Sequence, residues 1–160
     1  MVILLVLIAV ILDFTTGKVS NKLILIGLLL SFVFTVVVNK HSIIYYFLGV
    51  FLPIVLLLII FVIGGIGAGD VKLFAVIGGF IGYQGVFQCI IVSFIFGAII
   101  AIFKLLLERN LIKILRNISL YLFGIFQSKQ IQTLEREKSN TIHFTLPILF
   151  SVLCYIGGIL

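Results

Sequence analysis

The stretch GGIGAGDVKLFAVIGG, residues 64–79, places one aspartate and one lysine inside sequence that is otherwise apolar. Glycine destabilises a helix interior, and an ionisable side chain within lipid is costly. A run of glycines directly before Asp70 therefore predicts that one apolar helix ends here and another begins. In such surroundings the charged side chains of Asp70 and Lys72 are candidate functional groups.

The composition around this stretch indicates that the solvent of the protein is lipid. Hydrophobic residues make up 63% of the 160 residues and charged residues 10%, with a mean hydropathy of +1.44. A soluble domain has about 25% charged residues. The apolar runs are continuous, whereas a membrane β-barrel alternates in polarity over segments of about ten residues. The sequence therefore predicts an all-α polytopic membrane protein in contact with the lipid bilayer.

Six apolar segments, separated by polar or glycine-rich residues, predict six transmembrane helices in a single membrane-embedded domain, residues 1–160. The first segment is short for a hydrocarbon core of about 30 Å and can continue past Asp13. A turn is expected at residues 83–85, between the fourth helix and the fifth. The expected helices cover residues 2–12, 21–38, 43–63, 70–81, 86–107 and 141–160.

The segment between the last two expected helices, residues 108–140, is rich in charged side chains and is expected to be a cytoplasmic loop. Its first part, ERNLIKILRNISLYLFGIF, has apolar residues at helical spacing, with Lys113 and Arg116 elsewhere on the helical wheel. This pattern is typical of an amphipathic helix that lies on an anionic membrane surface.

The distribution of basic residues predicts how the helices are oriented in the cell membrane. Lysine and arginine are concentrated after the first, third and fifth expected helices, and Lys40 is the basic residue on the other side. The side rich in basic residues is cytoplasmic by the positive-inside rule. Both termini are then extracytoplasmic, and Asp13 and Asp70 both lie at the cytoplasmic face. The net charge of +6 is attributed to these loops, so no nucleic-acid partner is expected.

Asp13 and Asp70 are the only aspartates among the five acidic residues of the chain. Two carboxylates that come close cannot both ionise cheaply, so one keeps a proton and the pair supplies an acid and a base. Such a pair can activate water to attack a peptide carbonyl. Taken singly, Asp13 could be a helix cap or a loop carboxylate, and Asp70 could be the N-cap of the fourth helix. Together they predict a catalytic pair.

The glycines before Asp70 are expected to serve the same site. Gly64, Gly65, Gly67 and Gly69 are expected to end the third helix and to let an extended substrate backbone approach closely. The later glycines of the stretch are explained by close packing between membrane helices.

The segment GIGAGDVKLFA, residues 65–75, resembles the GxGD aspartyl proteases of the type IV prepilin peptidase family. In that family a second catalytic aspartate ends the first helix of the catalytic domain and precedes an Ile-Pro-Asn sequence. Asp13 matches this aspartate, and Asn21 matches the asparagine. Ser20 stands where proline is usual, which loosens the turn and leaves the catalytic assignment intact.

The resemblance extends to HFTLPILF, residues 143–150, because the family has a proline near the start of its last helix. It implies an aspartic endopeptidase that cleaves the basic leader peptide of prepilin-like substrates (Flp pilins, pseudopilins or preflagellins) at the cytoplasmic membrane face. The chain resembles a short form without the methyltransferase-type segment, so no methylation and no cofactor are expected. The expected substrate-binding or supporting residues are Asn21, Gly67, Gly69, Lys72 and Pro147.

Two other functions are consistent with part of this pattern. A presenilin-like or signal-peptide-peptidase-like intramembrane protease also uses two aspartates, and those proteins are longer. A small ion-coupled transporter could use Asp13 and Asp70 as a cation site beside a broken helix. No cluster of histidine, cysteine and acidic residues has the spacing of metal ligands, so no metal is expected.

Overall fold

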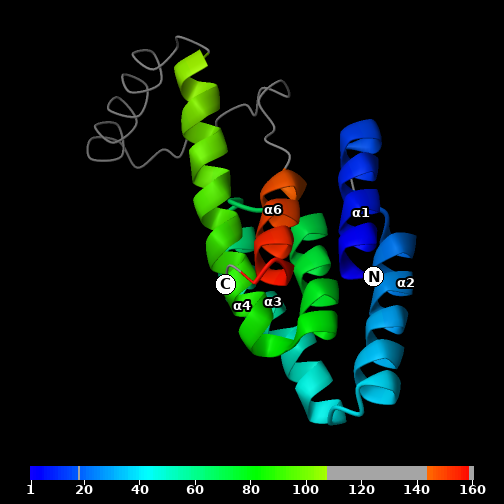
Figure 1. Ribbon diagram of the computed structural model, residues 1–160. Helices are drawn as coiled ribbons and strands as arrows, with labels where there is room; N and C mark the ends of the chain where they lie inside the picture. Colours follow the sequence, from blue (N-terminus) through cyan, green and yellow to red (C-terminus); the bar gives the residue numbers. More distant parts are fainter. Residues whose placement is uncertain (18, 108–143, 159–160) are drawn as a thin grey trace. The chain divides into compact units, whose positions relative to one another are not determined.

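The computed structural model describes residues 1–17, 19–107 and 144–158. All regular elements in these ranges are helices (Figure 1). The chain divides into two compact units. The first, Met1–Gly97 with His143–Leu160, is called the bundle below; the second, Ala98–Ile142, includes the last turns of the longest helix. The elements are α1 (Val2–Thr16), α2 (Asn21–Phe32), the π-helical η1 (Val33–Val38), α3 (Ile43–Val62), α4 (Ala68–Leu107) and α6 (Thr145–Ile156).

The predicted all-helical fold is confirmed for the described residues, and most helix bounds agree with the prediction. α2 and η1 together cover the expected segment 21–38, and α1 continues past Asp13 to Thr16. The last helix is shorter than predicted, because α6 ends at Ile156 and Gly158 follows in the left-handed conformation, with φ +73°. The predicted amphipathic helix within 108–140 lies outside the described residues.

Among the described helices, three are long and apolar enough to cross a membrane. They are Asn21–Val38, Ile43–Val62 and Ala68–Lys104, while Val2–Thr16 and Thr145–Ile156 are shorter apolar helices. Long apolar helices of this kind are consistent with a membrane protein. The predicted number of six crossings therefore stays a prediction.

The fourth and fifth predicted helices are the two parts of α4, and the turn predicted at residues 83–85 is wrong. These residues are helical, and the single non-helical residue inside α4 is Gly82, with φ 78° and ψ 176°. This backbone conformation is essentially restricted to glycine. A Cβ on Gly82 would also collide with the side chain of Tyr45 from α3. One glycine therefore bends α4 sharply where the sequence suggested a short loop (Figure 1).

The first part of α4 is the central helix of the bundle. Residues 73–79 are consecutively buried, so every face of this helix is covered. A helix that is apolar on all sides is typical of a position inside a larger assembly of helices. The side chains of its core cluster include Val6 and Ala9 of α1, Ile24 of α2, Leu57 of α3, Phe74 and Ile77 of α4, and Ile148 and Val152 of α6.

Small residues let α3 and η1 approach this central helix closely. A Cβ on Gly49 would collide with the carbonyl oxygen of Gly78, and a Cβ on Gly78 would collide with the carbonyl oxygen of Gly49. The buried hydroxyl of Thr35 donates a hydrogen bond of 2.6 Å to the carbonyl oxygen of Gly79. Contacts between small residues, with polar hydrogen bonds across helices, are typical of packing within membranes.

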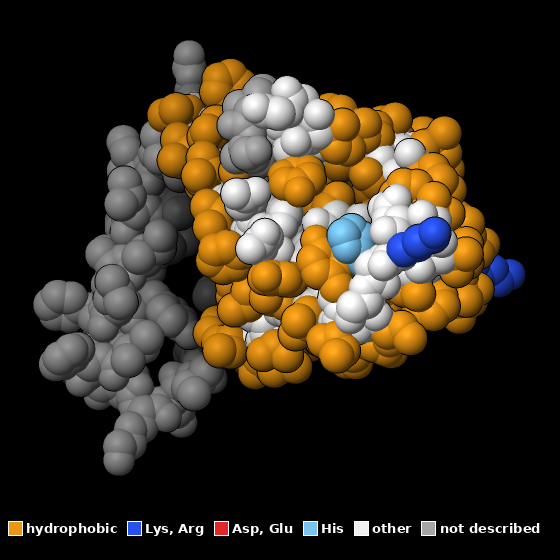
Figure 2. All heavy atoms as spheres, turned by 60° about the horizontal axis from the view of Figure 1, so that its bottom comes forward, with side chains coloured by type: hydrophobic (Ala, Val, Ile, Leu, Met, Phe, Trp, Pro, Cys, Tyr) orange, Lys and Arg blue, Asp and Glu red, His pale blue; other side chains and the backbone are white. Residues whose placement is uncertain are grey.

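The outside of the bundle is largely apolar. Figure 2 shows hydrophobic side chains over most of the described surface in its view, with few lysine and histidine side chains. A water-soluble monomer rarely exposes an apolar surface of this extent. Exposed large hydrophobic side chains include Leu25, Leu29, Val55, Ile59 and Ile95.

Candidate active site

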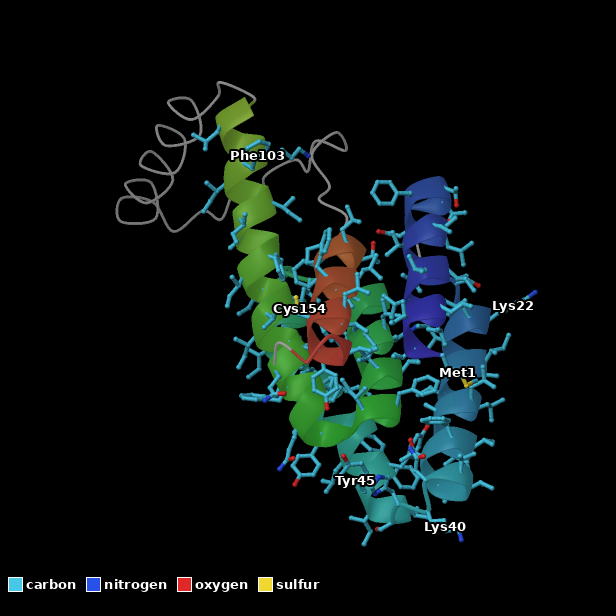
Figure 3. The ribbon with its side chains drawn as sticks, in the orientation of Figure 1. Met1, Lys22, Lys40, Tyr45, Phe103 and Cys154 are labelled. Carbon is cyan, nitrogen blue, oxygen red and sulfur yellow. The ribbon has the colours of Figure 1, made fainter. Side chains whose placement is uncertain are left out.

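Five helix ends meet at one end of the bundle, which is called the site end below. α1 and α3 end there, and α2, α4 and α6 begin there (Figure 1). The predicted site residues Asp13, Asn21, Asp70 and Lys72 all belong to these helix ends. Figure 3 marks the two ends of α2 and η1: Lys22 lies near the start of α2, at the site end, and Lys40 lies at the opposite end, after η1.

Asp13 lies in the last turn of α1, and its side chain is half-buried. Its backbone carbonyl accepts a hydrogen bond of 2.8 Å from the N–H of Gly17, which has a φ of +67°. A glycine in the left-handed conformation is a common end of a helix. The hydroxyl of Thr16 donates to the carbonyl of Leu12 at 2.7 Å. The last turn that carries Asp13 is therefore regular and well capped.

The carboxylate of Asp13 is contacted from the other end of the chain. The Thr145 hydroxyl donates a hydrogen bond of 2.8 Å to Oδ2 of Asp13. Thr145 is the first residue of α6 and is completely buried. Pro147, a predicted site residue, lies buried two residues later, in the first helical turn, where a missing N–H costs no helical hydrogen bond. Pro147 thus belongs to the turn that presents Thr145 to Asp13.

The glycine run before Asp70 separates α3 from α4 by a compact cap. Gly64 has a φ of +82°, and its N–H donates to the carbonyl of Phe61 at 2.9 Å. The N–H of Gly65 donates to the carbonyl of Ile60, also at 2.9 Å. These two bonds form a Schellman motif, which ends a helix and satisfies its last carbonyls. The prediction that the glycines end the third helix is confirmed for these two positions.

Asp70 lies in the first turn of α4 and is half-buried. It is the third residue of that helix, so the alternative of an N-cap residue is wrong. The N–H groups of Asp70 and Val71 donate to the carbonyl of Gly67, at 3.1 and 3.3 Å. A carboxylate in the first turn interacts favourably with the positive end of the helix dipole. The helix start therefore supports a negative charge at this position.

Gly67 and Gly69 each leave room for a neighbouring group. A Cβ on Gly67 would lie 3.0 Å from Oδ2 of Asp70, so a larger residue would press on the carboxylate. A Cβ on Gly69 would lie 3.4 Å from Cβ of Val19, which belongs to the connection between α1 and α2. Gly69 therefore allows the residues after Asp13 to pack against the start of α4.

Lys72 and Asn21 are joined directly. The ammonium group of Lys72 donates a hydrogen bond of 2.9 Å to Oδ1 of Asn21, and both residues are exposed. This bond connects the first turn of α4 with the first residue of α2. Two residues that the sequence predicted separately as supporting residues are thus in contact.

The site end therefore holds together through three contacts between different elements. They are the Thr145–Asp13 hydrogen bond, the packing of Val19 on Gly69, and the Lys72–Asn21 hydrogen bond. Asp13 and Asp70 lie on two of the connected helix ends, and both are partly accessible to solvent. Two carboxyl groups in such a position can act as an acid and a base toward water and a bound peptide.

The residue that sequence reasoning missed is Thr145. A threonine two residues before a proline at a helix start is ordinary helix-start chemistry, and its pattern gives no indication of a contact with Asp13. In the described ranges, no group of three histidine, cysteine or acidic residues is arranged to hold a metal ion. The polar groups of the described site are two carboxyl groups, one hydroxyl, one amide and one ammonium group.

Comparison with known proteins gives one finding. The sequence profile of the type IV leader peptidase family matches residues 1–102 of the chain. The matched region contains Asp13, Asn21, Asp70 and Lys72, whereas α6 lies beyond it. No curated protein and no solved structure matches the chain.

Proposed function

Because the chain belongs to the type IV leader peptidase family and is therefore a protease, we propose that it is an aspartic endopeptidase with Asp13 and Asp70 as its catalytic pair. The observation that carries this proposal is their common location. The only two aspartates of the chain lie at the same end of the bundle, on helix ends that are connected by contacts between elements.

The proposed reaction is hydrolysis of a peptide bond by water. An ionised carboxylate takes a proton from water, whose oxygen attacks the scissile carbonyl carbon. The protonated carboxyl group donates to the carbonyl oxygen, and a proton then passes to the leaving amine. The two carboxyl groups titrate as a pair, so the proposal assigns neither proton-transfer role to one residue alone.

The supporting residues have roles that follow from their contacts. Gly67 leaves space beside the carboxylate of Asp70, and the open glycine-rich connection allows a substrate backbone to come close. Lys72 and Asn21 form a polar rim next to the start of α4. Pro147 belongs to the turn that carries Thr145. No metal or other cofactor takes part in the proposed reaction.

We further propose that the substrate is a prepilin-like protein with a basic leader peptide. Cleavage would take place at the cytoplasmic face of the cell membrane, since the positive-inside rule assigns the site end to that side. A membrane-embedded peptidase suits such a substrate, because an apolar substrate helix can stay in lipid while the leader reaches the site. Six crossings with both termini extracytoplasmic complete this proposal.

The first prediction tests the catalytic pair. Asp13→Asn and Asp70→Asn each keep the size of the side chain and remove its ability to ionise. Each change should lower cleavage of a prepilin-like substrate by at least about a hundredfold, the usual contribution of general acid–base catalysis. The measurement is leader removal from co-expressed prepilin-like proteins, followed by kinetics with purified enzyme in detergent.

Glu135→Gln is the matched control, since it makes the same carboxyl-to-amide change at an acidic residue of the polar segment 108–140. This variant should cleave at the wild-type rate. Near-full cleavage by either aspartate variant, at equal amounts in the membrane, would rule out the proposed pair. Cation-coupled uptake without any cleavage would instead favour a transporter.

A further inference from the structure

The hydrogen bond between Thr145 and Asp13 connects residues that are 132 positions apart in the sequence. Thr145 has no exposed surface, so its hydroxyl needs a partner within the protein. The partner at 2.8 Å is a carboxylate oxygen that is itself only half-buried. A fully enclosed donor thus faces an acceptor at the border of the solvent.

We propose that Thr145 is a positioning residue, which holds the carboxylate of Asp13 in place for catalysis. This inference rests on the proposed function, because it gives Asp13 a catalytic role. Thr145 acts through Asp13 and is not assigned a contact with the substrate.

The hydrogen bond from Thr145 gives the side chain of Asp13 an anchor on a different helix. The last turn of α1 fixes the backbone of Asp13, while the torsions of its side chain are set by what the carboxylate contacts. A hydrogen bond from a different helix restricts these torsions. Catalytic groups must be held within roughly half an ångström of the productive geometry, and supporting hydrogen bonds provide this restriction.

Buried hydrogen bonds join α6, which carries the donor, to α4. The hydroxyl of Ser93 in α4 donates a hydrogen bond of 2.7 Å to the hydroxyl of Ser151, and both residues are fully buried. The hydroxyl of Ser151 donates to the carbonyl of Ile148 at 2.8 Å. Pro147 and Ile148 are buried next to Thr145. The donor therefore belongs to a helix that buried contacts join to α4.

The charged groups at the site end are the same with and without the Thr145 hydroxyl. In the described part of the bundle they are Asp70 and Lys72 of α4 and Lys22 of α2, and the start of α6 contributes the neutral hydroxyl of Thr145. Replacing Thr145 by valine alters none of these charges. A loss of cleavage in this variant would therefore not come from a changed charge at the site end.

The chain offers a matched pair of substitutions to test this role. Thr145→Val and Thr35→Val both remove a buried hydroxyl that donates to a group of another element. Only the first hydroxyl contacts Asp13. We expect kcat of Thr145→Val to fall about tenfold to a hundredfold at unchanged KM, the usual effect of losing a hydrogen bond to a charged group. Thr35→Val should keep kcat within about threefold, although the protein becomes less stable.

Two further readouts separate positioning from simple structural support. Thr145→Ser keeps the donor and should restore most of kcat. KM of Thr145→Val should stay at the wild-type value, because Thr145 is not assigned a contact with the substrate. Full activity of Thr145→Val, or an equal loss of kcat in the two valine variants, would overturn the inference.

A measurement without turnover keeps this test separate from the proposed function. Carboxyl groups are labelled with a water-soluble carbodiimide and an amine, and labelling of Asp13 is followed by mass spectrometry. Asp13 should react several-fold faster in Thr145→Val than in Thr35→Val. If the wild type cleaves no leader peptide, the proposed function fails, and equal labelling of Asp13 in both variants overturns the positioning role. If Thr145→Val does not accumulate, Thr145→Cys, with its weaker thiol donor, replaces it in both measurements.

Discussion

At the scale of single residues, the Lys72–Asn21 pair is an exposed contact at the site end. Its hydrogen bond of 2.9 Å joins the start of α2 to the turn that contains Asp70. Lys72 adds a positive charge to the first turns of α4, where Asp70 also lies. Asn21 restricts the direction of that lysine. The pair is therefore suited to adjust the site electrostatically.

Lys72→Met should lower kcat/KM about fivefold, since interactions of exposed charges are worth up to about 1 kcal/mol. Asn21→Ala should have a smaller effect in the same direction, because the lysine keeps its charge. The measurement is cleavage of a prepilin-like substrate at low and high salt, and the loss should shrink as salt screens the charge.

Lys22→Met is the control for this prediction. Lys22 is also exposed, follows Asn21 directly, and points away from the bundle in Figure 3. The Lys22→Met variant should cleave like the wild type at both salt concentrations. An equal effect of the two lysine substitutions would show that the total charge of this end matters and the Lys72–Asn21 contact does not.

At the scale of elements, the bend in α4 depends on one residue. Gly82 has a φ of 78° and a ψ of 176°, and the side chain of Tyr45 occupies the position that a Cβ would need. The bend allows the part of α4 before Gly82 to occupy the centre of the bundle. Asp70 begins this central part, so the geometry of the site depends indirectly on the bend.

Gly82→Ala should lower the free energy of unfolding by several kcal/mol. The backbone conformation costs of order 1–3 kcal/mol for a residue other than glycine. Overpacking against Tyr45 adds about 1–3 kcal/mol. Thermal or denaturant unfolding of the purified protein in detergent measures the loss.

Gly64→Ala is the comparison variant, since Gly64 also has a positive φ, +82°, with nothing within 4 Å of its Cβ position. It should show the backbone cost alone, about 1–2 kcal/mol. In a Tyr45→Ala background, the two glycine substitutions should lower the free energy of unfolding by similar amounts. Equal losses in the wild-type background would contradict the role given to Tyr45.

At the scale of the whole molecule, charge and apolar surface indicate how the bundle lies in the membrane. Asp13, Asp70, Lys22 and Lys72 belong to the helix ends of the site end, whereas Lys40 lies at the far end of η1 (Figure 3). α2 and η1 together span 18 residues, or about 27 Å at 1.5 Å per residue. This length is close to the hydrocarbon thickness of about 30 Å. The two lysines are thus expected on opposite sides of the membrane.

Single-cysteine labelling tests this orientation. Cys89 and Cys154 are first replaced by alanine, and Lys22→Cys or Lys40→Cys is then introduced. A membrane-impermeant maleimide should label Lys40→Cys in intact cells and Lys22→Cys only after the membrane is opened. The reverse pattern would place the site end outside the cell and contradict cleavage at the cytoplasmic face.

The sequence determined those properties that depend on local pattern. Continuous apolar runs predict helices, and glycines after residue 63 predict their ends, because hydropathy and backbone freedom act within a few residues. The positions of Asp13 and Asp70 near helix ends followed in the same way. The sequence predicted a turn at residues 83–85, just after the actual bend at Gly82, because a polar Tyr-Gln-Gly sequence resembles a loop.

The tertiary structure alone decided which distant residues meet. The Thr145–Asp13 bond, the Lys72–Asn21 bond and the collision that reserves Gly82 for glycine all join different helices. No local pattern encodes them, because they depend on how helix surfaces fit together once every helix has formed. The two catalytic candidates and the supporting residues Asn21 and Lys72 could therefore be proposed from the sequence, while Thr145 and the contacts that join these residues became apparent only from the packed bundle.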